Sequence, residues 1–358
     1  MILRCLVLIA LLGGFASPLA AAGSAPEPPS DLKLVFALTK PTERPPSTAI
    51  FAYDVKAAAR TEVYRDADKG DRVLLKIAGS DLLGAGRCFP PGDLYVIIGP
   101  PSVQLGASPS DYLSRLTLGA AAQGWQRLLP IPLSFSDASS YGLWNRAPIF
   151  AISPGANRIA FTALRVGSVK LDRPAIRVLT LAGAEEWQIP LPSSDFSVTD
   201  LAWSPDGSRL AYCLLPLGDE HTLDESLLPK AGVYVAEMAE RTASLVYPCY
   251  GEAIAWGPKP NRIAVAVHSR DIWSPVDLVQ VVVLPVRQKV EEFSVPGSAQ
   301  ALAYADGDWL AVQVSKDGRQ EIWVYPGTGG LGRRVYERPE GEGRLALLGW
   351  ARAGGEAP

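Results

Sequence analysis

Two histidines are the residues of this chain best suited to metal chemistry. His221 and His268 are the only histidines in 358 residues. Imidazole nitrogens and carboxylate oxygens together form sites for zinc and other divalent metals. The carboxylates near them in sequence are Asp219, Glu220, Asp224, Glu225 and Asp271. One interpretation is a metal site drawn from His221, His268, Asp219 and Asp224. The other, which the loose spacing favours, is a solvated acidic loop beside an unrelated histidine.

No other catalytic pattern is present. The sequence contains no H-E-x-x-H, no glycine-rich phosphate loop and no C-x-x-C motif. Ser204 does not lie in a G-x-S-x-G elbow, and serine or cysteine catalysis would also need one of the two histidines. We therefore predict no catalytic residue and no cofactor, with a divalent metal as the alternative.

A second group of residues is suited to binding rather than to catalysis. Aromatic side chains and arginine are the usual anchors of protein interfaces, and loops on a rigid scaffold commonly carry recognition. Candidates of this kind occur in three predicted loops: Tyr141, Trp144 and Arg146; Lys170, Asp172 and Arg173; and Asp271 and Trp273. The alternative is that each loop tryptophan packs over its own strands.

The elements that position these loops follow from residues 197–215, SVTDLAWSPDGSRLAYCLL. Alternation of apolar with small or polar residues predicts a strand. Pro205 has no backbone N–H and cannot continue that strand, while Gly207 accepts a positive φ. A second apolar strand follows the Ser-Pro-Asp-Gly turn. The segment therefore predicts a β-hairpin.

Weaker copies of this hairpin recur along the chain. Large–small–large triplets end at Ile152, Trp203, Trp256, Tyr304 and Trp350, at intervals of 46 to 53 residues. Four of the triplets are followed by a turn and a matching apolar strand. A period of about 40–50 residues made of strands and turns is typical of β-propeller blades. Equivalent loops of adjacent blades emerge on the same face, which would bring the candidate binding residues and both histidines together.

The pattern predicts an all-β, six-bladed β-propeller at residues 32–358. Residues 345–351 supply a strand that lacks a hairpin partner, and residues 32–65 lack an innermost strand. The C-terminal strand should therefore complete the N-terminal blade, which closes the ring and leaves no long sheet edge exposed. The predicted blades are 32–65 plus 345–351, 72–133, 148–192, 198–248, 252–296 and 300–339.

Three segments resemble the WD40-like repeats of the TolB-type periplasmic propellers: WSPDGSRLAY, FAISPGANRIAF and SKDGRQEIWVY. The resemblance covers most of residues 32–358 and is poorest in the second blade. It implies the propeller fold and leaves the activity open. TolB-type proteins carry an additional N-terminal α/β domain, which we do not expect here because only about ten residues separate the leader from the first strand.

The N-terminus predicts export. Residues 1–22 contain Arg4, an apolar run and a small-residue end, which is the pattern of a secretory signal peptide. Residues 23–31 then form a flexible lead, and we expect no transmembrane segment in the mature chain. The formal net charge is −3 without a basic stripe, so nucleic acid is not an expected partner. The predicted location is periplasmic or secreted.

Three cysteines remain after the leader: Cys88, Cys213 and Cys249. Export permits a disulfide, and Cys213 and Cys249 are the nearer pair in sequence. The predicted map places a strand between them, and strands lie about 4.8 Å apart, so a bridge across two spacings is disfavoured. Buried thiols are the favoured interpretation.

These observations predict an exported, non-catalytic β-propeller that binds a protein, peptide or envelope component through its loop-rich face. The alternative is a metal-dependent hydrolase or lactonase-like enzyme with its site in the propeller funnel. A binder of small ligands is a third interpretation, which the tryptophan-bearing loops favour weakly.

Overall fold

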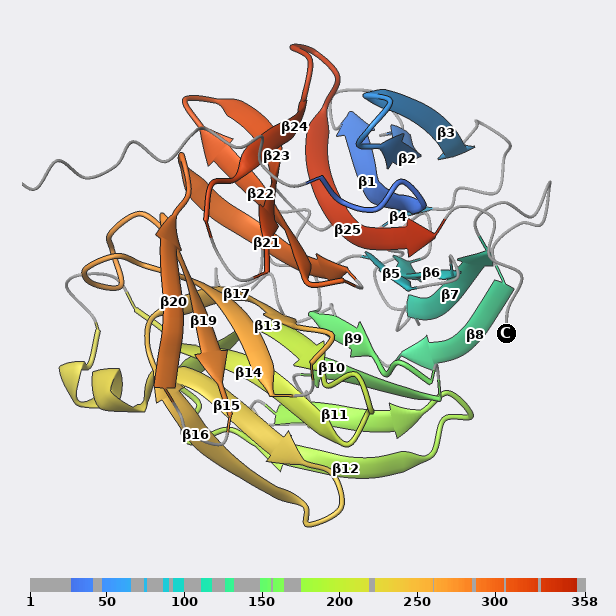
Figure 1. Cartoon of the computed structure of the whole chain (residues 1–358). Helices are drawn as coiled ribbons and strands as arrows, with labels where there is room; N and C mark the ends of the chain where they lie inside the picture. Colours follow the sequence, from blue (N-terminus) through green and yellow to red (C-terminus); the bar gives the residue numbers. More distant parts are fainter. Residues whose placement is uncertain are drawn as a thin grey trace, which may run out of the picture.

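The described strands form five β-sheets arranged around a ring (Figure 1). The computed structural model describes residues 27–40, 47–65, 74–75, 86–89, 93–99, 111–117, 126–131, 149–155, 157–163, 175–218, 223–259, 261–284, 288–305, 307–327 and 330–352. The predicted leader, residues 1–22, lies outside this part of the chain. Within it the architecture is an all-β propeller, as predicted.

Four of the sheets are regular blades of four antiparallel strands. The first consists of β9 (Phe150–Ile152), β10 (Arg158–Ala163), β11 (Ala175–Thr180) and β12 (Glu185–Pro190). The second consists of β13 (Phe196–Trp203), β14 (Arg209–Pro216), β15 (Gly232–Glu237) and β16 (Thr242–Pro248). The third consists of β17 (Gly251–Trp256), β18 (Arg262–Val267), β19 (Leu278–Val283) and β20 (Gln288–Ser294). The fourth consists of β21 (Ser298–Ala305), β22 (Trp309–Lys316), β23 (Arg319–Pro326) and β24 (Arg333–Glu337). The sheet order follows the chain order in each blade.

The fifth sheet has nine strands and corrects the predicted blade count. Its members are β1 (Leu32–Lys40), β2 (Ser47–Asp54), β3 (Ala59–Arg65), β4 (Leu74–Leu75), β5 (Gly86–Phe89), β6 (Asp93–Gly99), β7 (Asp111–Thr117), β8 (Gln126–Ile131) and β25 (Arg344–Arg352). A parallel bridge between Gly349 of β25 and Cys88 of β5 joins two predicted blades into one sheet. The described strands therefore form five blades, and the prediction of six is wrong. Strands of the two predicted blades are hydrogen-bonded to each other through their backbones. Separate blades would instead contact each other through side chains.

Closure of the ring by the C-terminal strand is confirmed. Strand β25 runs antiparallel to β1, from the pair Leu32–Arg352 to the pair Thr39–Arg344, and one bulge occurs between Val35 and Phe36. Figure 1 shows the two ends of the described chain side by side at this point. The closure leaves neither β1 nor β25 as a free sheet edge.

Side chains reinforce this closure. Gln313 of β22 is 3% exposed, donates to Leu345 O at 3.0 Å and accepts from Leu347 N at 2.7 Å. Arg60 of β3 donates to both carboxylate oxygens of Glu342, which lies in the connector just before β25, and its distance to Oε1 is 2.6 Å. Hydrogen bonds therefore connect β25 to the fourth regular blade, and the connector before it to β3 of its own sheet.

The strands of residues 72–133 differ from the predicted blade at their start. The sequence predicts strands at residues 73–78, 94–99, 112–118 and 126–131 of this blade. Strands β6, β7 and β8 overlap the last three, and β8 has the predicted bounds. Strand β4 is only two residues long and pairs with β6. Strand β5, which makes the bridge to β25, was not predicted.

The Ser-Pro-Asp-Gly turn has the expected structural role. Gly207 adopts φ +68° and donates to Ser204 O at 2.9 Å. Asp206 Oδ1 accepts from the Ser204 hydroxyl at 2.6 Å and from Ser208 N at 3.1 Å. These hydrogen bonds lower the pKa of Asp206 to about 2. Asp206 is therefore a turn residue that stays ionised at neutral pH.

The hydrophobic core is divided among the interfaces between neighbouring blades. One cluster lies between the first two regular blades and contains Phe196 and Tyr212, and similar clusters lie at the following interfaces. The tryptophans of the repeat connect blades directly. Trp203 Nε1 donates to Ala151 O at 3.1 Å, and Trp350 Nε1 donates to Ala303 O at 3.0 Å. Each of these two indoles reaches the backbone carbonyl of the small central residue in the preceding triplet.

Candidate functional site

The best-defined loop on the predicted binding face joins β18 to β19. This segment, residues 268–277, is named the Trp273 loop. Asp271 Oδ1 accepts from Trp273 N at 2.9 Å, and Asp271 O accepts from Ser274 N at 3.1 Å and from the Ser274 hydroxyl at 2.8 Å. The same hydroxyl accepts from Arg270 N at 3.0 Å. The loop therefore has a fixed backbone although its surface is exposed.

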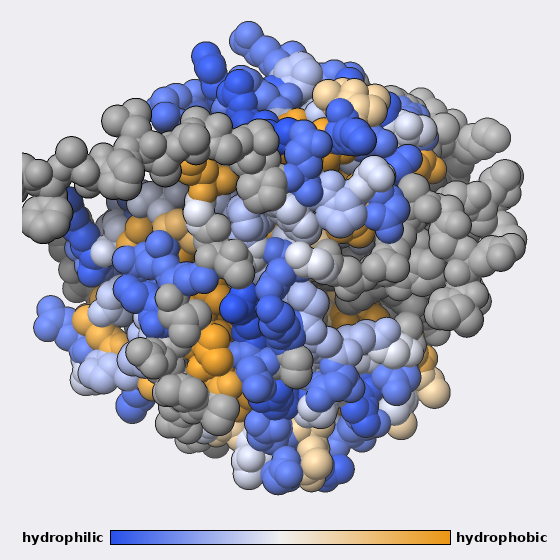
Figure 2. Space-filling view, in the orientation of Figure 1, coloured by the Kyte–Doolittle hydropathy of each residue, from blue (hydrophilic) through white to orange (hydrophobic). Residues whose placement is uncertain are grey.

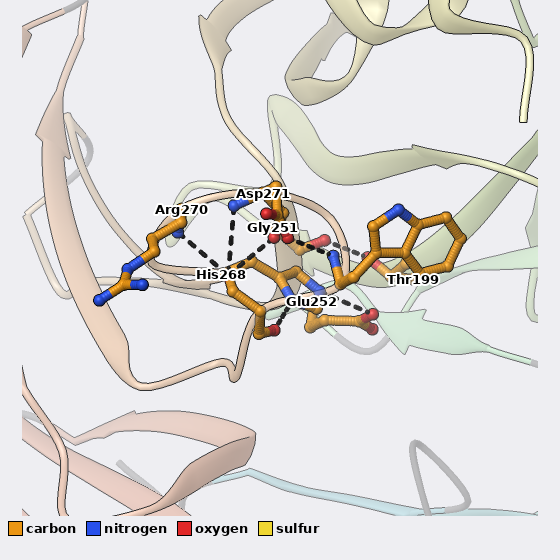
Figure 3. Close-up of polar contacts among 8 residues, drawn as sticks. Thr199, Gly251, Glu252, His268, Arg270 and Asp271 are labelled. Carbon is orange, nitrogen blue, oxygen red and sulfur yellow. Dashed lines mark hydrogen bonds and ion pairs between the residues drawn. The ribbon is translucent and has the colours of Figure 1, made fainter. Parts of the chain in front are cut away.

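His268 anchors the loop to the blade (Figure 3). Its Nε2 lies 3.3 Å from Glu252 Oε1, and its Nδ1 contacts Ser274 O. The backbone N–H of His268 donates to Tyr250 O at 3.0 Å. The imidazole, whose side chain is 10% exposed, thus joins the start of β17 to the far side of the loop.

The surroundings of His268 favour its charged form. Burial disfavours the imidazolium, but the Glu252 carboxylate, the Ser274 carbonyl and the charge of Asp271 outweigh burial and raise the pKa of His268. An imidazolium can donate from both nitrogens, to Glu252 and to Ser274, which a neutral imidazole cannot do.

The inner strands beneath the loop are joined by buried polar groups. Thr199 Oγ1 donates to Gly251 O at 2.8 Å, as Figure 3 shows. Asp200 Oδ2 accepts from Ile254 N at 3.0 Å, and its Oδ1 accepts from Leu201 N at 2.9 Å. These bonds tie β13 to β17, so the base of the Trp273 loop is fixed to two blades.

A groove of about 470 Å³ lies beside the loop, between the third and fourth regular blades. It is lined by Pro275 and Asp277 of the Trp273 loop, by residues 295–298 of the connector from β20 to β21, and by residues 315–317 at the turn from β22 to β23. Asp277 O accepts from Val295 N at 2.8 Å, which joins two of the three walls. All three segments lie at the same end of their strands.

The groove combines polar and apolar groups. Oδ1 of Asp277 is buried and has no hydrogen-bond partner among the residues that the structure describes. Lys316 and Asp317 are exposed on the opposite wall, and the Ser298 and Ser315 side chains supply hydroxyls. Val295 and the prolines provide apolar surface. Such a lining suits a polypeptide, which presents amides, charges and apolar groups together.

Figure 2 shows that the described surface seen in the orientation of Figure 1 is mostly hydrophilic, with hydrophobic groups in small separate areas. The large hydrophobic side chains exposed in the described part of the chain are Leu217, Trp273 and Leu331. Trp273, at 49% exposure, lies on the loop whose residues Pro275 and Asp277 line one wall of the groove.

Only some of the predicted site residues fall in the described part of the chain. Asp271 and Trp273 lie together on the Trp273 loop. Eight others lie outside the described residues: Tyr141, Trp144, Arg146, Lys170, Asp172, Arg173, Asp219 and His221. Their assignment to the binding face or to a metal site stays a prediction.

The predicted metal ligands that can be placed have other roles. Asp224 caps the short 3-10 helix η2 (Glu225–Lys230) by accepting from Ser226 N at 2.9 Å, and this hydrogen bond helps to lower the pKa of Asp224. Both ring nitrogens of His268 are engaged by Glu252 and Ser274. In the described ranges no three His, Cys, Asp or Glu side chains form a group that could hold a metal ion. This part of the chain gives the enzyme alternative no support.

Sequence reasoning did not find the groove. Its three walls are far apart in sequence, and two of them consist of residues ordinary for turns, such as Pro296, Gly297 and Asp317. A Cβ on Gly297 would lie 2.6 Å from Ser315 O, so the glycine permits the close approach of connector and turn. Gly297 is the one residue whose type indicates a close contact at this place. The strand that it contacts, β22, can be recognised only in the folded structure.

Comparison with solved structures supports the propeller fold. TolB from Acinetobacter baumannii is 13% identical, with a TM-score of 0.55, and the match covers 89% of this chain and 66% of that protein. This chain has the fold of a TolB-type β-propeller. A chain of a nidogen/laminin complex is 11% identical, with a TM-score of 0.53, and the match covers 89% of this chain and 97% of that one. At these identities the likeness concerns the fold alone.

Two further comparisons found no match for this chain. No protein-family model matches the sequence, and neither does any curated protein. Among the residues placed by the structure, no helix is long and apolar enough to cross a membrane. This chain spans just under two thirds of the length of the Acinetobacter TolB.

Proposed function

We propose that this chain is an exported, non-catalytic β-propeller that binds a protein or peptide of the cell envelope, in the periplasm or outside the cell. The Trp273 loop and the adjoining groove form the contact surface. The observation that carries the proposal is an exposed tryptophan held on a hydrogen-bonded loop beside a groove of mixed polarity.

The fixed loop favours affinity. Binding costs free energy when side chains and loops must be ordered, and a surface that is ordered beforehand avoids part of this cost. Asp271, Ser274 and His268 already hold the backbone around Trp273. The indole itself can then serve as an anchor, since tryptophan is enriched among residues that dominate binding energy.

The comparisons support a scaffold without specifying the partner. One of the similar structures is a chain of a complex between two proteins, nidogen and laminin. The similar TolB has the same fold, and TolB-type propellers are periplasmic, which agrees with the signal peptide predicted at residues 1–22. The first observation agrees with a role in binding a protein, and the second agrees with export.

The test is capture of a partner by the mature protein, residues 23–358, from an envelope extract of the native host, followed by measurement of the Kd with the purified partner. Trp273→Ala should weaken binding by at least about tenfold, because a buried interface tryptophan commonly contributes more than about 1.4 kcal/mol. Lys316→Glu tests the groove by reversing a charge on its wall.

Leu331→Ala is the matched control. Leu331 is 87% exposed and lies between β23 and β24, at the opposite end of the strands from the groove. This variant removes exposed apolar surface of similar kind and should bind normally. Equal partner capture by the wild type, Trp273→Ala and Lys316→Glu would place the contact elsewhere on the ring.

A further inference from the structure

Cys213 and Cys249 come together at the interface between the second and third regular blades. The position that a Cβ atom would take on Gly251 lies 3.0 Å from Cys213 Sγ and 3.6 Å from Cys249 Sγ. Both sulfurs therefore lie close to this one position, and the distance between them is at most the sum of these two distances. Both residues belong to the same apolar cluster.

The strand expected between these two cysteines is present, but it does not keep their thiols apart. Cys213 pairs with Val233 of β15, and Val233 pairs with Tyr247 of β16, so within the sheet two strand spacings do intervene. Cys249, however, lies beyond the end of β16, on the connector that crosses to the inner strand β17. This crossing brings its thiol to the face of the blade on which the Cys213 thiol lies.

Glycine at position 251 leaves the space between the sulfurs open. Any Cβ at this position would lie 3.0 Å from Cys213 Sγ, closer than ordinary contacts allow. Both thiols are free in the structure, and formation of a disulfide requires the sulfurs to approach to about 2.05 Å, so at least one side chain must move.

We propose that Cys213 and Cys249 form a disulfide in the exported protein. The electron acceptor is another disulfide, from a small-molecule or protein oxidant. The Cys249 thiolate attacks that disulfide to give a mixed disulfide and one free thiol. The Cys213 thiolate then attacks Cys249 Sγ, forming the Cys213–Cys249 bond and releasing the second thiol of the oxidant. Two thiols are oxidised and one disulfide is reduced to two thiols.

Burial dictates when this exchange occurs. Cys213 is fully buried, and burial raises its pKa well above the usual range of a thiol. Burial likewise raises the pKa of Cys249 to about 12. Because the thiolate is the nucleophile, exchange is slow once the blades have packed, and the bridge forms during folding. The packed interface then protects it from reductants.

The bridge would act on the base of the proposed binding surface. Cys249 is followed by Tyr250, whose carbonyl accepts from His268 N, and two residues later by Glu252, which contacts the imidazole. A covalent link at Cys249 thus fixes the connector that His268, at the start of the Trp273 loop, contacts through Tyr250 O. The bridge itself does not depend on whether that loop binds a partner, so either proposal can fail alone.

The test is disulfide mapping of the mature protein refolded in a mixture of reduced and oxidised glutathione. After alkylation of free thiols and tryptic digestion, the expected product is residues 210–230 linked to residues 242–262, lighter by two hydrogens than the two peptides together. Reduction should lower the Tm by roughly 5 °C, because the bridge closes a loop of the unfolded chain.

Two variants separate this pairing from others. The Cys88→Ser variant should still give the linked peptide, and its Tm should be that of the wild type. The Cys249→Ser variant should give no linked peptide, and its Tm should not respond to reductant. Alkylation of both Cys213 and Cys249 after oxidative refolding would overturn the proposal. A bridge that includes Cys88 would overturn it equally.

Discussion

His268 illustrates how one side chain can organise a loop. It contacts Glu252 on one side and the Ser274 carbonyl on the other, so the ring spans the base of the Trp273 loop. The histidine was singled out in the sequence as a candidate metal ligand. Its partners in the structure are hydrogen-bonding groups, and they assign it a supporting role.

The protonation of His268 should control how firmly the loop is held. A pKa that is raised on folding means that the folded state binds the proton more tightly than the unfolded chain. This stabilisation is complete below the unfolded pKa of about 6.5 and is lost as the pH rises through the higher folded pKa. We expect an NMR titration of the imidazole in His221→Gln, which leaves one histidine signal, to show a pKa above about 6.5.

Glu252→Gln provides the matched variant for this titration. Glutamine keeps the shape and removes the charge that favours the imidazolium, so the pKa of His268 should fall. A wild-type value below about 6.5 would show that burial outweighs Glu252, Ser274 and Asp271.

At the scale of elements, the innermost strands are joined by buried side chains as well as by sheet pairing. Asp200 and Thr199 connect β13 to β17, and Gln313 connects β22 to β25. These polar groups replace the sheet hydrogen bonds that neighbouring blades cannot make with each other. They also fix how far adjacent innermost strands are shifted along each other, because each hydrogen bond can form at only one such position.

Gln313→Leu should therefore destabilise the closure. It leaves Leu345 O and Leu347 N buried without their partner, and each orphaned group costs about 1–3 kcal/mol. We expect the free energy of unfolding in urea to fall by about 3 kcal/mol. Gln280→Leu is the control, because Gln280 bonds Glu292 in an exposed pair and accepts from the Tyr247 hydroxyl, which is only partly buried. Water can replace these partners, so the loss should cost about 1 kcal/mol. Equal losses in both variants would refute this role of Gln313.

At the scale of the whole molecule, the ring depends on its last strand. Strand β25 is the antiparallel partner of β1 and the parallel neighbour of β5, so it holds both halves of the nine-stranded sheet. Trp350 and Leu345 also contribute to the core between this sheet and the fourth regular blade.

Removal of residues 344–358 should open the ring. The truncated chain would expose the edges of β1 and β5 together with the apolar faces that β25 covers, and such edges promote association. We expect loss of the cooperative thermal transition and elution as oligomers in size-exclusion chromatography. A truncated monomer with an unchanged Tm would contradict this dependence. Removal of residues 353–358 alone is the control and should leave the Tm unchanged.

Much of the fold could be predicted because local residues determine it. Trp203, Pro205 and Gly207 specify a strand and a turn wherever they occur, and the repeat at residues 345–351 predicted the closure. The blade count could not be obtained in this way. Whether β25 and β5 pair through the Gly349–Cys88 bridge depends on backbone edges, which leave no pattern in the side chains.

The candidate site was predictable only in part, for the same reason. Trp273 could be identified as a loop aromatic from its neighbours in sequence. The groove beside it is built from three segments whose proximity comes from the packing of blades. The approach of Cys249 to Cys213 likewise depends on the path of a connector across the blade, which strand spacing alone does not describe.

The pairing of β1 with β25 has a consequence for the order of events in folding. The two partners are more than 300 residues apart in sequence, so their contact carries a large loop-closure entropy and belongs to the late, slow part of folding. A growing chain can complete its middle blades first, but its N-terminal strands must wait until the final residues are available. Until then the protein is an open arc in which the edge of β1 is unpaired and prone to association. During this interval the chain most needs a chaperone.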